Sequence, residues 1–330
     1  MRRVAIWVAV FLIGVVIGLG RADAAKWNVG FANLALTDPI SGGPMTGMVT
    51  YPTLAKPYSY RVGPYYLEVV ENAPPAEGTF PLIVFSPGKA GAPENYNNYF
   101  TALTQRGFIV AGVAHPGDNR EDRSGTNGDA ELVWRTHHVV TLIDRLLADA
   151  PLASHIDPRR IGMIGHSAGA YTALLLVGAR PDFSQLRGRC KGNPNRPPGG
   201  ARVIHDPSQR PVTDPRIRAA VIMAPAWGCF FDREGLKNAN APLLIYHSTD
   251  DEVLYRKYDG EYVASQLPHK PELVVLTGAG HFVYLAPCPF IMRLFAPREV
   301  CVDPGGIDRV ALHARMHIEI ADFFTRSLGL

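Results

Sequence analysis

The chain has 330 residues, of which 47% are hydrophobic and 19% are charged. This length and composition are typical of one large globular α/β domain with insertions, and they exclude a disordered chain. The formal net charge is only +3, and no long run of Lys and Arg is present. A nucleic-acid partner is therefore not expected.

The first residues have the pattern of a secretory signal peptide. Arg2 and Arg3 precede 17 uncharged residues, and Ala-Asp-Ala follows at positions 22–24. We predict that residues 1–24 are removed by cleavage after Ala24 and that residues 25–330 form the mature catalytic domain. The alternative is an uncleaved anchor, because the apolar run lies at the lower edge of the spanning range. After cleavage, no stable membrane insertion is expected.

Short apolar runs alternate with helical patterns from residue 80 onward. The alternation predicts an α/β fold with a mostly parallel central sheet and helices on both faces. Two weaker runs, at 47–53 and 65–70, predict an antiparallel hairpin at the sheet edge. The expected strands are 80–88, 108–117, 160–167, 218–226, 241–248 and 272–278, and the expected helices are 94–107, 130–150, 168–178 and 308–328.

One segment interrupts this alternation. Residues 180–218 contain nine Lys or Arg against three Asp, with many Pro and Gly. The composition predicts a basic surface insertion, either a lid over the site or an anion-attracting rim. The alternative is a solvated loop held by a disulfide at Cys190.

The chain has four cysteines, and in an oxidising compartment an even number predicts two disulfides. Three pairings are possible. The most local pairs Cys190 with Cys229 and Cys288 with Cys301, and four buried thiols are the alternative. No metal site is predicted, because no C-x-x-C or H-x-x-x-H pair lies near these cysteines.

The sequence Gly165-His166-Ser167-Ala168-Gly169 lies between a predicted strand and a predicted helix. This is the context of a nucleophile elbow, in which a sharp turn exposes a serine at the carboxyl end of the sheet. The glycines make room for the turn, and the helix amides favour developing negative charge. The alternative is a tight packing turn with an incidental serine.

A serine hydroxyl needs a base, and in this architecture an acid and then a histidine follow later in the chain. Asp250 and Asp251 come just after a predicted strand, and His281 lies in a Gly-rich turn after the last strand. His281 would take the proton of Ser167, and an aspartate would orient the imidazole.

Two further histidines and two amides complete the predicted site. His115 ends a strand on the same side of the sheet as the serine, and His166 supports the elbow; both are predicted substrate-pocket residues. The backbone N–H groups of Ala168 and Lys89 are the predicted oxyanion donors, since Lys89 lies in the loop after the first central strand. The alternative for that loop is an ordinary strand-end turn.

These motifs together resemble the α/β-hydrolase superfamily. The sequences "FSPGKAG", "GFIVAGVAHPGDN", "IGMIGHSAGA" and "GAGHF" are similar to the branch that holds dienelactone-hydrolase-like proteins and platelet-activating-factor acetylhydrolases. The resemblance implies Ser167, Asp251 and His281 as the triad, with Lys89 and Ala168 as the amide donors. Asp250 is the alternative acid, and if Asp251 is the acid, Asp250 caps the turn. It departs from the branch at Ser-Pro-Gly, where the acetylhydrolases usually have Ser-His-Gly, and at the charged Lys89.

The expected function is that of an exported serine esterase which cleaves short-chain or phospholipid-like acyl esters through an acyl-enzyme. Its partner is a small-molecule ester, and no metal or organic cofactor is required. A peptidase or amidase with the same triad is the alternative, followed by a non-catalytic binding protein of this fold. The sequence leaves the acyl chain length, the alcohol and the oligomeric state undetermined.

Overall fold

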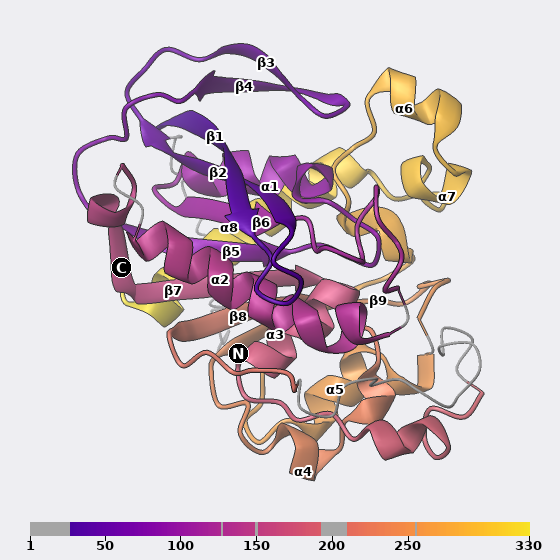
Figure 1. Cartoon of the computed structure of the whole chain (residues 1–330). Helices are drawn as coiled ribbons and strands as arrows, with labels where there is room; N and C mark the ends of the chain where they lie inside the picture. The colour runs from indigo at the N-terminus through magenta and orange to yellow at the C-terminus, as the bar shows by residue number, and fades with distance from the viewer. Residues whose placement is uncertain (1–26, 127, 149–150, 193–209, 255) are drawn as a thin grey trace, which may run out of the picture.

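The computed structural model describes residues 27–126, 128–148, 151–192, 210–254 and 256–330. One ten-stranded sheet runs through its centre (Figure 1). The strands are β1 (Asn28–Thr37), β2 (Pro44–Thr53), β3 (Tyr58–Val62), β4 (Tyr65–Glu71), β5 (Phe80–Ser86), β6 (Ile109–Val113), β7 (Ile156–His166), β8 (Ile217–Met223), β9 (Leu243–Ser248) and β10 (Glu272–Leu276). The helices are α1 (Asn97–Thr104), α2 (Arg135–Ala148), α3 (Ala168–Leu176), α4 (Arg233–Leu236), α5 (Gly260–Gln266), α6 (Phe290–Phe295), α7 (Arg298–Cys301) and α8 (Arg309–Leu328).

The strand order is β10-β9-β8-β7-β5-β6-β2-β1-β4-β3. Strands β5 to β10 are parallel neighbours, as the sequence predicted. The other end of the sheet is mainly antiparallel, since β2 pairs with β1 and β6, and β4 pairs with β3. The predicted hairpin of 47–53 with 65–70 is therefore wrong. The reason is that β1 lies between β2 and β4 in the sheet, and β4 forms its antiparallel hairpin with β3.

Helices cover both faces of the sheet. Helices α1 and α8 contribute Tyr99, Phe100 and Phe324 to the core on one face, and α2 and α3 contribute Leu142 and Leu174 on the other. Every residue of β5 and β6 is buried, because a parallel strand covered on both faces has no polar side. This packing fixes the carboxyl ends of β5, β7 and β9 at one edge of the sheet, where the loops carry the predicted site.

Two disulfides have the predicted pairing, Cys190 with Cys229 and Cys288 with Cys301. Such bonds are typical of an extracellular or periplasmic protein. The second closes a projecting segment, residues 288–306, which we call the outer lobe; it contains α6 and α7 (Figure 1). Neither helix has a buried residue. The lobe is therefore held by its covalent link and by the buried Arg309 of α8, which binds the carbonyl of Val300 and the carboxylate of Asp303.

The predicted signal peptide and the centre of the basic insertion lie outside the described residues. In the described part of the insertion, a short turn at Phe183–Leu186 precedes Cys190, and Ile217 already begins β8. None of the residues described between 180 and 218 lines the pocket reported below. In the part of the chain that the structure describes, no helix combines the length and apolar character needed to cross a membrane.

Candidate active site

Ser167 lies on a sharp turn between β7 and α3. Its φ of 55° is in the left-handed region that non-glycine residues rarely adopt. The turn is also very tight: a Cβ on Gly165 would lie 2.1 Å from the carbonyl oxygen of Gly169, and a Cβ on Gly169 would lie 1.9 Å from that of Ser86. Glycine is thus required on both sides of the serine, as a nucleophile elbow requires.

The structure brings His281 and Asp251 together. Nδ1 of His281 lies 2.7 Å from Oδ2 of Asp251, and the two side chains are 4% and 6% exposed. The other carboxylate oxygen accepts hydrogen bonds from the amides of Val253 and Leu254. Burial raises the pKa of Asp251, but the hydrogen bonds from His281 and these amides bring it below its usual value. The carboxylate is therefore ionised and aligned to orient the imidazole.

Asp250 does not share this position. Its side chain accepts a hydrogen bond from Thr249 and lies 3.7 Å from the exposed guanidinium of Arg256. The two aspartates thus point to different surroundings, although they are neighbours in sequence.

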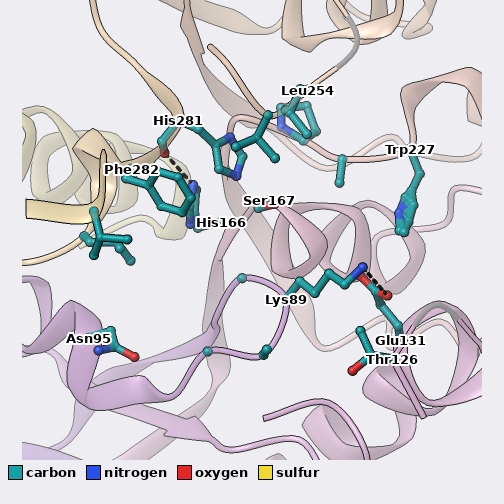
Figure 2. Close-up of a pocket in the computed structure, with 18 of the residues that line it drawn as sticks. Lys89, Asn95, Thr126, Glu131, His166, Ser167, Trp227, Leu254, His281 and Phe282 are labelled. Atoms are coloured by element: carbon teal, nitrogen blue, oxygen red, sulfur yellow. Dashed lines mark hydrogen bonds and ion pairs between the residues drawn. The ribbon is translucent and has the colours of Figure 1, made fainter. Parts of the chain in front are cut away.

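Ser167 and His281 line the same pocket, with the imidazole close to the serine in Figure 2. Gly88, Lys89 and Ala90 border it from the opposite side, and Ala168, the other predicted oxyanion donor, begins α3 directly after Ser167. The predicted nucleophile, base and oxyanion loop therefore converge from β7, from the segment after β10 and from the segment after β5.

His166 lines the pocket and supports His281, the predicted base. Its Nε2 donates to the carbonyl of His281 at 3.2 Å, and its Nδ1 lies 2.8 Å from the hydroxyl of Tyr96. Burial, reinforced by His281, holds the pKa of His166 well below its usual value. A neutral ring that donates from Nε2 must accept at Nδ1, so Tyr96 donates to it. The Tyr96 oxygen in turn accepts from the amide of Gly88, which links the base to the oxyanion loop.

His115 is placed differently from the prediction. It is fully buried and lies outside the pocket lining, with Nε2 2.9 Å from the hydroxyl of Ser86 and Nδ1 3.2 Å from His138. His138 continues this chain to Asp38 at 3.1 Å. The expectation that His115 lines the pocket is therefore corrected: the helix α2 covers this strand end, so the ring supports β5 from behind.

The pocket has a volume of about 510 Å³, and its walls differ in character. One side carries the apolar residues Trp227, Leu254 and Phe282, whereas the opposite side carries Asn95, Lys89, Thr126 and Glu131 (Figure 2). Lys89 Nζ lies 3.8 Å from the carboxylate of Glu131. Sequence reasoning missed Glu131 and Trp227, because nothing local marks them: Glu131 lies on a π-helical turn (Ala130–Trp134) within a predicted α-helix.

Among the described residues, one group of potential metal ligands was found, consisting of His247, Asp259 and Glu261. It does not line the pocket. One oxygen of Asp259 already accepts from the amides of Glu261 and Tyr262 at the start of α5. The group is thus accounted for as a helix cap with an adjacent histidine.

No family model matches the chain, and no curated protein matches it in sequence. Among solved structures, a ferulic acid esterase from Streptomyces cinnamoneus aligns with a TM-score of 0.65. The alignment covers 93% of this chain and 92% of that chain, at 20% sequence identity. The likeness shows that this chain has an α/β-hydrolase-like fold.

Proposed function

We propose that the protein is an exported serine hydrolase that cleaves carboxylic esters. The observation that carries the proposal is the 2.7 Å contact of the buried Asp251 with His281, beside a serine on a strained elbow in the same pocket. Acyl transfer through a serine requires a histidine beside the hydroxyl and a carboxylate that orients this histidine. The esterase activity named for the structural neighbour supports the same reaction class.

In the proposed reaction, Ser167 Oγ attacks the ester carbonyl while His281 Nε2 takes its proton. The carbonyl oxygen becomes an oxyanion near the amides of Lys89 and Ala168. His281 then returns the proton to the departing alcohol, which leaves an acyl group on Ser167. A water molecule, deprotonated by His281, releases the carboxylic acid and restores the serine. Asp251 stabilises the imidazolium in both halves of the cycle.

The pocket supports a small acyl group. About 510 Å³ accommodates a short acyl or single-ring acyl group, and the rings of Phe282 and Trp227, which lie on either side of Ser167 in Figure 2, favour a flat apolar one. We therefore include hydroxycinnamate esters, the class suggested by the neighbour's name, among the candidate substrates beside short-chain and phospholipid-like acyl esters.

Labelling with a fluorophosphonate tests the reaction class. The purified protein should be modified at Ser167, and the Ser167→Ala variant should take up no label and lose all ester turnover above background. A panel of nitrophenyl esters of increasing chain length, methyl ferulate and the matching anilides then separates esterase from amidase. Absence of labelling together with no turnover of any activated ester would overturn the proposal. Sequencing the N-terminus of exported protein should give Ala25.

A further inference from the structure

The loop that carries the predicted oxyanion amide, residues 86–91, lies over a buried ion pair. The side chains of Arg135 and Asp118 are 1% and 0% exposed, and Nη2 of the guanidinium lies 2.8 Å from Oδ2 of the carboxylate. Neither residue belongs to the triad. A buried ion pair is costly to desolvate, so it is retained only where its remaining hydrogen bonds are satisfied.

Here those hydrogen bonds go to the loop itself. Arg135 donates from Nη1 to the carbonyl of Pro87 at 2.6 Å and from Nη2 to the carbonyl of Gly88 at 3.1 Å. Asp118 uses its other oxygen, Oδ1, to accept from the amide of Ala90 at 2.8 Å. The pair thus holds the backbone on both sides of Lys89.

These contacts set the direction of the oxyanion donor. The carbonyl of Gly88 and the N–H of Lys89 belong to one planar trans peptide unit, so they point in opposite directions. When Arg135 binds the carbonyl from below the loop, the amide hydrogen of Lys89 points to the other side, where the pocket lies. The positive charge of the Arg135 guanidinium beside the carbonyl also polarises the peptide unit, which makes the Lys89 amide a stronger hydrogen-bond donor.

The ion pair also offsets backbone strain. Ala90 has a φ of 52°, a left-handed conformation that is unfavourable for a residue with a Cβ. Its amide is the group bound by Asp118. The loop supplies one restraint of its own, a hydrogen bond from the amide of Gly91 to the carbonyl of Gly88 at 3.0 Å. The ion pair adds the hydrogen bonds at Pro87, Gly88 and Ala90 to this turn.

We infer that Arg135 and Asp118 are positioning residues that pre-organise the oxyanion loop for the transition state. The inference rests on the proposed function. Lysine could not replace the arginine here, because its ammonium lacks the planar fork that reaches two carbonyls and a carboxylate together. The π-helical turn just before α2 brings Arg135 under the loop and Glu131 into the pocket wall.

The test compares Arg135→Lys with Arg216→Lys, a change at an arginine that binds Asp214 and Asp144 away from the pocket. Active-site titration with the fluorophosphonate first counts competent sites. For Arg135→Lys, kcat should fall by about 10- to 100-fold with KM within about twofold, since a displaced oxyanion donor acts on the transition state. Affinity for a trifluoromethyl ketone, whose hemiketal oxyanion uses the same amides, should fall in parallel. Arg216→Lys should change neither quantity.

Asp118→Asn provides a milder second variant, because its amide oxygen can still accept from Ala90. We expect the same signature with a smaller change, and this variant carries the test if Arg135→Lys does not fold. A merely structural pair would lower the melting temperature but leave kcat per titrated site and ketone affinity within twofold of wild type, which would overturn the inference. If wild-type protein neither labels nor turns over esters, the proposed function fails first and the inference fails with it.

Discussion

The catalytic edge and the outer lobe are built in opposite ways. The catalytic edge comprises residues 86–91 and 165–169. Its backbone is in close contact with other segments of the chain and is hydrogen-bonded to buried side chains. In the outer lobe, Phe290 and Phe295 are about four-fifths exposed, at 78% and 82%, and the restraints are the disulfide and the contacts of Arg309 with Val300 and Asp303. Yet Pro297 and Val300 of the lobe also line the pocket. An edge with an enclosed backbone thus faces a border whose two helices have no buried residue.

One added methyl group should affect the two regions very differently. Gly169→Ala would place a Cβ 1.9 Å from the Ser86 carbonyl oxygen, and both segments of backbone are too enclosed to move apart. We therefore expect the unfolding free energy to fall by more than about 4 kcal/mol and all ester turnover to be lost. In the outer lobe, a Cβ added by Gly305→Ala would have no atom within 4 Å, so this change should alter the unfolding free energy by less than about 0.5 kcal/mol. Denaturant titration of both variants measures this. A stable, active Gly169→Ala protein would show that the edge is not enclosed as described.

The next largest effect separates the two adjacent aspartates. Asp251→Asn keeps the shape but removes the charge that orients His281, so kcat should fall by about 10³- to 10⁴-fold with little change in KM. Asp250→Asn, at the exposed carboxylate beside Arg256, should stay within about twofold of wild type. Steady-state kinetics on an activated ester decides between them. Equal losses in the two variants would contradict the assignment of the acid.

Removing each disulfide compares an internal link with the link of the outer lobe. In the chain-entropy model, the bond spanning 39 residues contributes about 4 kcal/mol and the bond spanning 13 residues about 3 kcal/mol. The Cys190→Ser/Cys229→Ser protein should therefore be less stable than Cys288→Ser/Cys301→Ser. Thermal unfolding and kinetics of the two double variants provide the measurement.

The two disulfide variants should also differ in kinetics. Loss of the Cys288–Cys301 bond frees the segment that carries Pro297 and Val300, so KM should rise while kcat is kept. If KM responds instead to the Cys190–Cys229 bond, the insertion rather than the outer lobe borders the substrate.

The comparison also explains what the sequence could predict. The sharp turn at Ser167, the proximity of Asp251 to His281 and both disulfide pairs were predictable, because each depends on a short motif or on covalent chemistry. The central strands were predictable because burial on both faces leaves continuous apolar runs. Strands β1 and β3 were missed, since neither has a clear apolar pattern and each becomes a strand by pairing with a neighbour in the assembled sheet.

The supports of the site were the least predictable part. The role of Arg135 depends on a π-helical turn that changes which side of the helix faces the loop, and no local pattern marks that turn. The position of His115 depended on whether α2 or solvent covers the end of β6. Contacts between segments far apart in sequence decide both, whereas a motif records only local geometry.

The smallest effect that we predict concerns a buried histidine behind the base. His313 on α8 is 2% exposed, and its Nε2 donates to the carbonyl of Val283 at 2.6 Å, in the turn that begins at His281. Burial lowers the pKa of His313 to about 4. The folded protein therefore binds this proton more weakly than the unfolded chain, whose histidine titrates near 6.5. The contribution of the neutral His313 to the unfolding free energy is fully present above about pH 6.5. It is lost as the pH falls toward 4, and the loss is at most about 3 kcal/mol.

Replacing this histidine isolates its share of the acid sensitivity. His313→Gln keeps a donor for the Val283 carbonyl and does not titrate, so the fall in unfolding free energy between pH 6.5 and 4 should become shallower. A residual slope should persist, because burial lowers the pKa of the neighbouring His317 to about 3. His269→Gln, at an exposed position, is the control and should keep the wild-type slope. An unchanged slope in His313→Gln would mean that acid acts elsewhere, and the turn behind the base would then be held by packing rather than by a neutral imidazole.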